Sequence, residues 1–263
     1  MVYIQKLKKI RLLKNVGLFF LYFGFNPITF LNAFKNIPKF ISHYILWKKK
    51  GGKVNRLLPI LNEFDEESGV ASGQYFHQDL LVAQKIYHSK PPRHVDIASR
   101  VDGFVAHVAS FREIEVFDIR PLATNHKNII FKQIDLSNFD YELDKTPSLS
   151  CLHSLEHIGL GRYSDPIDVD GFEKALRNLI NLLNSNGTLY ISFPIGKKDE
   201  VHFNAHKVFH PKTILKNEDV KNNLILQEFD YVDDDGNLYI NQNVEDVVDK
   251  FNFALGIYTF KKV

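Results

Sequence analysis

From residue 90 onward, short apolar runs alternate with segments that have helical spacing. The apolar runs predict buried strands at 94–98, 113–117, 128–134, 149–152 and 188–193. Between them, 102–111 and 169–183 repeat with the period of a helix. The second segment places five apolar side chains on one face: Phe172, Leu176, Leu179, Ile180 and Leu183. Alternating strands and helices predict an α/β domain with a parallel sheet covered on both faces.

Further along, the pattern changes from alternation to paired strands. Residues 224–232 and 253–260 are predicted strands, and 233–237 (Asp-Asp-Asp-Gly-Asn) is a predicted turn. An antiparallel pair at the edge of an otherwise parallel sheet is compatible with this architecture. Asn186-Gly187 is expected to end the preceding helix.

The first 60 residues differ from the rest in charge. Twelve of the 33 basic residues lie within 1–62, and none of the 31 acidic residues precedes Glu63. We therefore expect two parts, a basic, apolar helical arm over 1–60 and an α/β domain over 61–263. A basic arm on an otherwise acidic chain indicates contact with something anionic. The basic residues are not interleaved with polar side chains that read bases, so no nucleic-acid partner is expected.

The arm also contains two aromatic-rich runs, 16–25 and 28–34, separated by Pro27. Each is shorter than the roughly 20 residues that a spanning helix needs. Lysines flank both runs, and Trp47 precedes Lys48, which is typical of a segment lying in an anionic membrane interface. The alternative is a helical pair that packs on the domain or on a second copy of the chain in a homodimer. The sequence leaves both interpretations open.

The number of cysteines indicates the redox state of the compartment in which the protein works. Cys151 is the single cysteine, which excludes an intrachain disulfide and a multi-cysteine zinc site. A reducing compartment is the natural interpretation. No small-residue cleavage site follows the basic start, so no secretory signal is expected. The expected location is the cytoplasm, with peripheral attachment to the inner membrane face if the arm binds lipid.

Acidic residues lie in or directly after three successive predicted strands. Asp96 lies in the first strand and is followed by Ser99 and Gly103, whereas Asp118 and Asp135 end the second and third strands. Ligands in such sheets bind at the carboxyl ends of the strands, and an acid there accepts hydrogen bonds from ribose hydroxyls. Aspartate is also a common capping residue, but the series favours a nucleoside site.

These residues resemble the class I S-adenosylmethionine-dependent methyltransferases. Asp96–Ser99 corresponds to the acidic, glycine-rich turn of that family, Asp118 to its ribose-binding acid and Asp135 to the acid near the adenine. The stretches 154–158 and 184–189 correspond to segments around its fourth and fifth strands. The resemblance implies a Rossmann-like, doubly wound, mostly parallel sheet and S-adenosylmethionine as cofactor, with Asp96, Ser99, Gly103, Asp118 and Asp135 as cofactor-binding residues.

A narrower resemblance is to DUF268, a methyltransferase-like family of unknown function. It is carried over roughly 20–263 by the stretches 65–69, 75–80, 96–111, 117–122 and 156–163. The chain departs from the methyltransferase pattern at the turn after the first strand. There, 98–103 contain Gly103 as their one glycine, and the side chains at 98–101 are expected to crowd the methionine half of the cofactor.

Histidines supply the candidate bases. His153, Glu156 and His157 have the spacing of an inverted zincin motif, which requires a continuous helix. The strand before them and the glycines after them argue against that helix. His202, His206 and His210 follow the fifth strand. We therefore expect His157 and His206, with Glu156 beside them, to form the catalytic group facing an acceptor hydroxyl, without a bound metal.

Three functions remain open at this stage. The first is methyl transfer from S-adenosylmethionine to a hydroxyl of a small molecule, sugar, glycan or lipid-linked acceptor. The second is a catalytically silent methyltransferase-like binding or scaffold protein, which the glycine-poor turn favours. The third is a metal-assisted enzyme that uses His153, Glu156 and His157.

Overall fold

The computed structural model describes residues 24–64, 68–124, 126–137 and 143–263. The chain divides into two compact units, 1–70 and 71–263, which are described separately. The predicted boundary between 60 and 61 stays a prediction. Most of the first predicted aromatic run, 16–25, lies outside the described residues.

The first unit is built on helix α2 (Pro27–Lys49). Its start is capped by Asn26, whose side-chain oxygen accepts from the Thr29 amide at 3.2 Å, and Pro27 occupies the first helical position. Residues 53–64 return along the helix: Asn36 donates to the Leu61 carbonyl and the Trp47 indole donates to the Lys53 carbonyl. Within the described part of the chain, no helix has the length and apolarity to cross a membrane.

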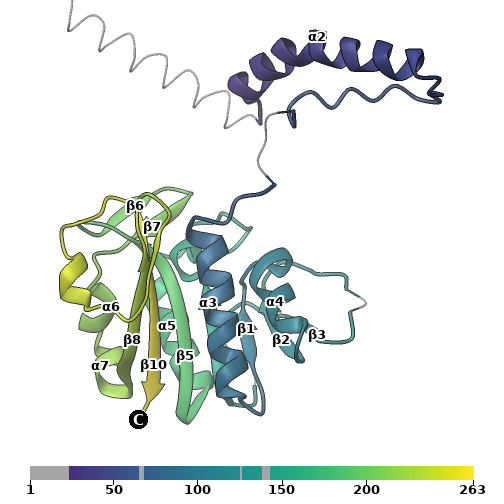
Figure 1. Cartoon of the computed structure of the whole chain (residues 1–263). Coiled ribbons are helices and arrows are strands. Elements are labelled where there is room, and N and C mark those ends of the chain that lie inside the picture. Colours follow the sequence, from purple (N-terminus) through teal and green to yellow (C-terminus); the bar gives the residue numbers. More distant parts are fainter. Residues whose placement is uncertain (1–23, 65–67, 125, 138–142) are drawn as a thin grey trace, which may run out of the picture. The chain divides into compact units, whose positions relative to one another are not determined.

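The second unit is a sheet with helices on both faces (Figure 1). Its helical elements are α3 (Gln74–Ser89), η1 (Val101–Val105), α4 (Ala106–Ala109), η2 (Leu155–His157), α5 (Gly171–Leu182), α6 (Thr213–Lys216), α7 (Glu218–Asn223) and η3 (Val244–Val247). Its strands are β1 (Val95–Ile97), β2 (Ile114–Asp118), β3 (Ile129–Gln133), β4 (Thr146–Leu152), β5 (Leu183–Ile195), β6 (Glu200–His202), β7 (His206–Val208), β8 (Leu224–Val232), β9 (Leu238–Tyr239) and β10 (Ala254–Lys262).

The main sheet has the strand order β3-β2-β1-β4-β5-β10-β8-β9. The first five strands of this order are parallel, whereas β10 is antiparallel to both β5 and β8. The order reverses between β1 and β4, which is where such sheets bind ligands. This is the predicted mostly parallel, Rossmann-like architecture of class I methyltransferases, and that prediction is confirmed.

Two apolar layers fix the sheet between its helices. Leu176 and Leu179 of α5 pack on one face, and Ile86 of α3 with Val108 of α4 packs on the other. Strand β10 supplies both layers, because successive side chains of a strand point to opposite faces. Its Ala254, Tyr258 and Phe260 belong to the α5 side, and its Leu255 and Ile257 to the α3 side.

One predicted boundary is wrong. Helix α5 ends at Leu182, and β5 begins directly at Leu183, so that Asn186-Gly187 lies inside a strand rather than at a helix end. Leu183 continues the apolar period of the helix, but it is buried as the partner of Thr146 in β4. The pairing of Leu183 with Thr146 therefore outweighs the local turn signal of Asn186-Gly187. The pairing of β4 with β5 shifts its register between Thr146 and Ser148.

Candidate functional site

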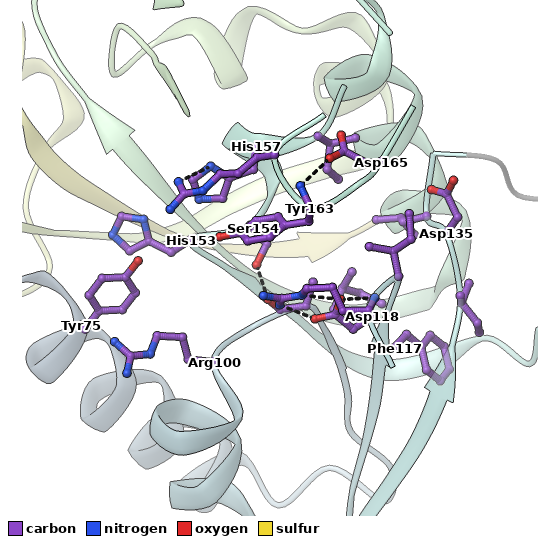
Figure 2. Close-up of a pocket in the computed structure, with 18 residues that line it drawn as sticks. Tyr75, Arg100, Phe117, Asp118, Asp135, His153, Ser154, His157, Tyr163 and Asp165 are labelled. Atoms are coloured by element: carbon purple, nitrogen blue, oxygen red, sulfur yellow. Dashed lines mark hydrogen bonds and ion pairs between the residues drawn. The ribbon is translucent and has the colours of Figure 1, made fainter. Parts of the chain in front are cut away.

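A cavity of about 290 Å³ lies at the carboxyl ends of β1, β2, β3 and β4 (Figure 2). Its lining residues come from α3, from the segments after those strands and from the loop after η2. They are Tyr75, Ile97, Ala98, Arg100, Phe117, Asp118, Ile119, Arg120, Ile134, Asp135, Leu136, His153, Ser154, His157, Ile158, Arg162, Tyr163 and Asp165. The cavity thus lies at the reversal of strand order, where the sequence predicted a ligand.

Asp118 ends β2 and lines this cavity, but its carboxylate already has a partner. Oδ1 accepts from the Arg120 backbone amide at 2.8 Å and from Arg120 Nε at 3.0 Å, and Oδ2 accepts from Arg120 Nη2 at 2.5 Å. The Arg120 guanidinium also lies 4.4 Å from the centre of the Tyr163 ring. A ribose that binds both oxygens of Asp118 would therefore compete with the Arg120 side chain.

Asp135 follows β3 and lines the same cavity as Asp118. Its Oδ1 accepts from the backbone amide of Ser137 at 2.9 Å and from its hydroxyl at 2.7 Å. Phe117, Asp118 and Asp135 lie on one side of the cavity in Figure 2. The structure therefore brings together two of the three predicted strand-end acids.

The other predicted cofactor residues lie behind the cavity lining. Asp96 is fully buried, and its carboxylate accepts from the Ser99 amide, the Ser99 hydroxyl and the Ser150 hydroxyl at 3.0, 2.7 and 2.5 Å. Burial raises the pKa of Asp96 to about 7. Gly103 faces Asp79 of α3, whose Oδ2 would clash with an added Cβ. None of the three lines this cavity, and the predicted role of Asp96, Ser99 and Gly103 in cofactor binding stays a prediction.

The turn after β1 has a glycine-like backbone conformation at Ala98, which is not a glycine. Ala98 has a φ of +56°, in the left-handed region that side chains rarely adopt, and it lines the cavity. This conformation costs an alanine about 1–2 kcal/mol. The backbone thus approaches the cavity as a glycine-rich turn does, with one methyl group added to the wall. The sequence predicted crowding by the side chains at 98–101, and Ala98 and Arg100 are the two that line the cavity.

His157 is held as a neutral imidazole. Its Nδ1 donates to the Ala205 carbonyl at 2.7 Å, so the other ring nitrogen, Nε2, carries the lone pair. Burial lowers the pKa of His157 below its ordinary value of 6.5. An unprotonated nitrogen at neutral pH is what a general base requires.

Glu156 lies between the two cavity histidines and is fully buried. Its Oε1 is 2.7 Å from His153 Nδ1 and 3.6 Å from His157 Nε2, whereas its Oε2 is buried without a hydrogen-bond partner. His153 also contacts Gln74 Oε1 through Nε2 at 3.1 Å and stacks on Tyr75 at 4.6 Å. Glu156 is therefore hydrogen-bonded to His153 and lies near His157 without a hydrogen bond to it.

The metal alternative depended on a continuous helix through 153–157. His153 instead has a φ of +53°, and η2 begins two residues later at Leu155. The helical alignment of His153 with His157 is therefore absent. Across the described residues, no three His, Cys, Asp or Glu side chains are arranged to hold a metal ion.

His206 approaches the site without lining the cavity. Its ring centre is 6.5 Å from that of His157 and 5.0 Å from that of His202, whose Nδ1 lies 3.1 Å from His206 Nε2. Burial and these two neighbouring histidines lower the pKa of His206. The structure thus brings the two predicted bases side by side, with His157 nearer to the ligand space. Their catalytic roles, and that of Glu156, stay predictions.

Sequence reasoning missed part of the lining. Tyr75, Arg100, Arg162, Tyr163 and Asp165 were not assigned a role. Asp165 organises its loop by accepting from the backbone amides of Gly159, Gly161 and Tyr163. Four of them, Tyr75, Arg100, Arg162 and Tyr163, fall inside stretches that carried the narrower family resemblance, which was the available signal. Nothing in the local pattern shows that α3 and the loop after η2 meet at one cavity.

Comparison with known proteins agrees with this architecture. A family model described as "Caenorhabditis protein of unknown function, DUF268" matches residues 125–234. No curated protein sequence matches the chain. Among solved structures, the [4+2]-cyclase SpnF aligns with a TM-score of 0.50 at 10% identity, over 88% of this chain and 96% of its own.

Two further solved structures are methyltransferases. The N-methyltransferase NodS from Bradyrhizobium japonicum WM9, in complex with S-adenosyl-L-homocysteine, has a TM-score of 0.49 and 13% identity, with 79% of this chain and 93% of that chain covered. An S-adenosylmethionine-dependent methyltransferase from Clostridium acetobutylicum ATCC 824 has a TM-score of 0.45 and 14% identity, over 73% and 93%. The predicted resemblance to the DUF268 family is confirmed over residues 125–234, within a domain that has the class I methyltransferase topology.

Proposed function

We propose that this protein is an S-adenosylmethionine-dependent methyltransferase that methylates a hydroxyl of a small-molecule, sugar, glycan or lipid-linked acceptor. One observation carries the proposal. Two strand-end acids, Asp118 and Asp135, and a neutral histidine, His157, line one cavity at the reversal of strand order. An acidic nucleoside subsite beside a base is what this chemistry needs.

The lining fits a nucleoside-containing cofactor. Apolar side chains from three strand ends can enclose a base: Ile97, Phe117, Ile119, Ile134 and Leu136. Asp118 offers two oxygens to a ribose once Arg120 moves away. Ala98, in its glycine-like conformation, leaves the turn backbone close to the ligand. The volume of about 290 Å³ is near the lower end for small-molecule sites, and displacement of Arg120 would enlarge it.

The chain's own residues supply positioning and proton transfer. A bound methyl donor supplies an electrophilic methyl group. His157 Nε2 would take up the proton of the acceptor hydroxyl as the oxygen forms its bond to that methyl carbon. The methyl carbon's bond to the donor's sulfonium sulfur would break at the same time, and the donor would leave as the neutral thioether. The Ala205 carbonyl keeps Nδ1 protonated, so that Nε2 remains the acceptor. The cavity walls would hold the donor and the acceptor oxygen next to each other, and such positioning supplies most of the rate of a methyl transfer.

Asp118→Ala is expected to weaken binding of S-adenosylhomocysteine at least about tenfold. The variant loses a charge-assisted hydrogen-bond acceptor for the ribose, worth on the order of 1.5–3 kcal/mol. Isothermal titration calorimetry of parent and variant measures the effect. Glu113→Ala is the control, because Glu113 is exposed just before the opposite end of β2. Equal affinities in a folded Asp118→Ala variant and the parent would remove Asp118 from the site.

A binding protein without catalysis is the second candidate, and two contacts favour it. Arg120 already occupies the Asp118 carboxylate, and Ala98 adds a methyl group where the turn needs none. If the parent protein shows no heat of binding with S-adenosylhomocysteine or S-adenosylmethionine, this candidate replaces the methyltransferase proposal.

We further propose that the basic arm attaches the protein to an anionic membrane at its cytoplasmic face. Helix α2 ends in Lys48 and Lys49, with Lys50 next, and Trp47 directly before them. Each lysine near an anionic surface contributes about 1 kcal/mol of attraction. The full chain should float with vesicles that contain phosphatidylserine, and a chain with Lys48, Lys49 and Lys50 changed to Gln should float markedly less. Equal flotation would favour packing of the arm on the domain or on a second copy.

A further inference from the structure

We propose that Arg162 and Arg120 form a binding site for an anionic group of the acceptor, a phosphate or a carboxylate. Both side chains line the cavity, and their guanidinium carbons lie 5.2 and 4.4 Å from the centre of the Tyr163 ring. Planar guanidinium groups bind phosphate and carboxylate through paired N–H donors. The assignment of this anion to the acceptor rests on the proposed function.

Arg162 has unused donors. Its Nη1 donates to the Ala205 carbonyl at 2.8 Å. Within the described part of the chain, Arg162 forms no ion pair with a carboxylate. A guanidinium has five N–H groups, so most of them remain available at an exposed position beside the cavity. Arg162 therefore has free N–H donors with which to bind an anion.

The carboxylates of the cavity do not neutralise the positive charge of Arg162. Asp165 accepts from three backbone amides of its own loop, and Asp135 accepts from Ser137. Asp118 is paired with Arg120, and a ribose that takes Asp118 would release that second guanidinium. Cofactor binding therefore leaves two guanidinium groups beside Tyr163, and it favours an acceptor that carries negative charge.

The geometry also relates the anion to the proposed base. Arg162 Nη1 and His157 Nδ1 donate to the same Ala205 carbonyl and lie 3.2 Å apart. The ring of Tyr163 meets that of His157 edge to face at 5.6 Å. An anionic group on Arg162 would thus hold a neighbouring hydroxyl near His157. Sugar acids and sugar phosphates, which carry hydroxyls a few bonds from the anion, are the class that fits.

Titration with inorganic phosphate and with acetate, in the absence of cofactor, tests the site. The parent should bind phosphate with a dissociation constant on the order of 1 mM, followed by phosphorus NMR or by calorimetry. Arg162→Gln should weaken this binding at least about tenfold. Arg162→Lys should retain more phosphate binding than acetate binding, because lysine keeps the charge but loses the planar pair of donors. Arg177→Gln is the matched control, since Arg177 is an exposed arginine on α5 that pairs with Asp219.

Equal phosphate binding by the parent and Arg162→Gln, or no saturable binding by either, overturns the proposal. A second titration, with S-adenosylhomocysteine present, separates it from the proposed function. Tighter phosphate binding supports an acceptor site built from both arginines, unchanged binding removes Arg120 from the site, and displacement of phosphate by S-adenosylhomocysteine assigns the anion to the cofactor and overturns the proposal. Loss of phosphate binding in Arg162→Gln, with no S-adenosylhomocysteine binding by the parent, supports the anion site and rejects the methyltransferase.

Discussion

His157→Asn should lower the rate of methyl transfer at least about a hundredfold while leaving the affinity for S-adenosylhomocysteine close to that of the parent. The amide nitrogen of asparagine can still donate to the Ala205 carbonyl, as Nδ1 does at 2.7 Å. The variant lacks Nε2, the nitrogen that takes the acceptor's proton. Single-turnover rates and calorimetry together separate this loss of a base from a loss of binding.

His107→Asn is the matched control for that experiment. His107 Nδ1 contacts the Gly103 carbonyl at 2.6 Å, but His107 does not line the cavity. Its rate should stay within about threefold of the parent, because no catalytic proton passes through it. If His157→Asn retains the parent's rate, then His206 or another group is the base.

The same base predicts the pH dependence of the rate. Burial lowers the pKa of His157 from its ordinary value of 6.5. The neutral form is the active one, so the rate should be constant above pH 6.5 and should fall only as the pH drops through a value below 6.5. If the rate already falls when the pH is lowered from 8 to 7, the pKa of the base is not lowered as the burial of His157 requires.

Asp96→Ala should destabilise the domain by about 3 kcal/mol. Asp96 is fully buried, and its carboxylate accepts from the hydroxyls of Ser99 and Ser150 and from the Ser99 amide. Removing the carboxylate leaves these buried donors without their acceptor and opens a void beside β1 and β4. Urea denaturation measures the loss. Asp102→Ala, in the same turn, should change stability by less than about 0.5 kcal/mol, because Asp102 is exposed and pairs with the exposed Arg100.

Asp96→Asn adds a pH signature. Burial raises the pKa of Asp96 from 3.8 to about 7, so the folded protein favours the neutral carboxyl. The protonated carboxyl of Asp96 contributes fully to the free energy of unfolding of the parent below about pH 4. This contribution is lost as the pH rises towards 7. Asparagine cannot ionise, so the stability difference between parent and variant should shrink over that range. A difference that grows with pH would contradict the neutral carboxyl.

The sequence by itself determined most of the architecture. The apolar runs after residue 90 placed β1, β2, β3, β4 and β5, because buried parallel strands need continuous apolar side chains and crossover helices need one apolar face. Helix α3 (Gln74–Ser89) was not predicted, and the end of α5 was predicted wrongly. There, Leu183 satisfies a helical period and a strand partner equally well, and only its pairing with Thr146 decides between them.

Within the site, the sequence determined which residues follow the strands. Asp118, Asp135 and His157 line one cavity, and their roles there stay predictions. The tertiary structure alone decided which way the side chains face. Asp96 occupies a strand-end position like the other two acids, but it turns inward because Ser99 and Ser150 offer it donors across the sheet.

The tertiary structure also decided the partners that no local pattern encodes. Arg120 covers Asp118, the Ala205 carbonyl selects the tautomer of His157, and Arg162 comes to lie beside that imidazole. No sequence pattern predicts the contact of His157 with Ala205 or that of His157 with Arg162. Asp118 and Arg120 are close in sequence, but their contact depends on the rotamer of the Arg120 side chain. Local periodicity reports which side of an element is buried. It does not report which two elements meet at a cavity, because packing across the whole sheet sets that distance.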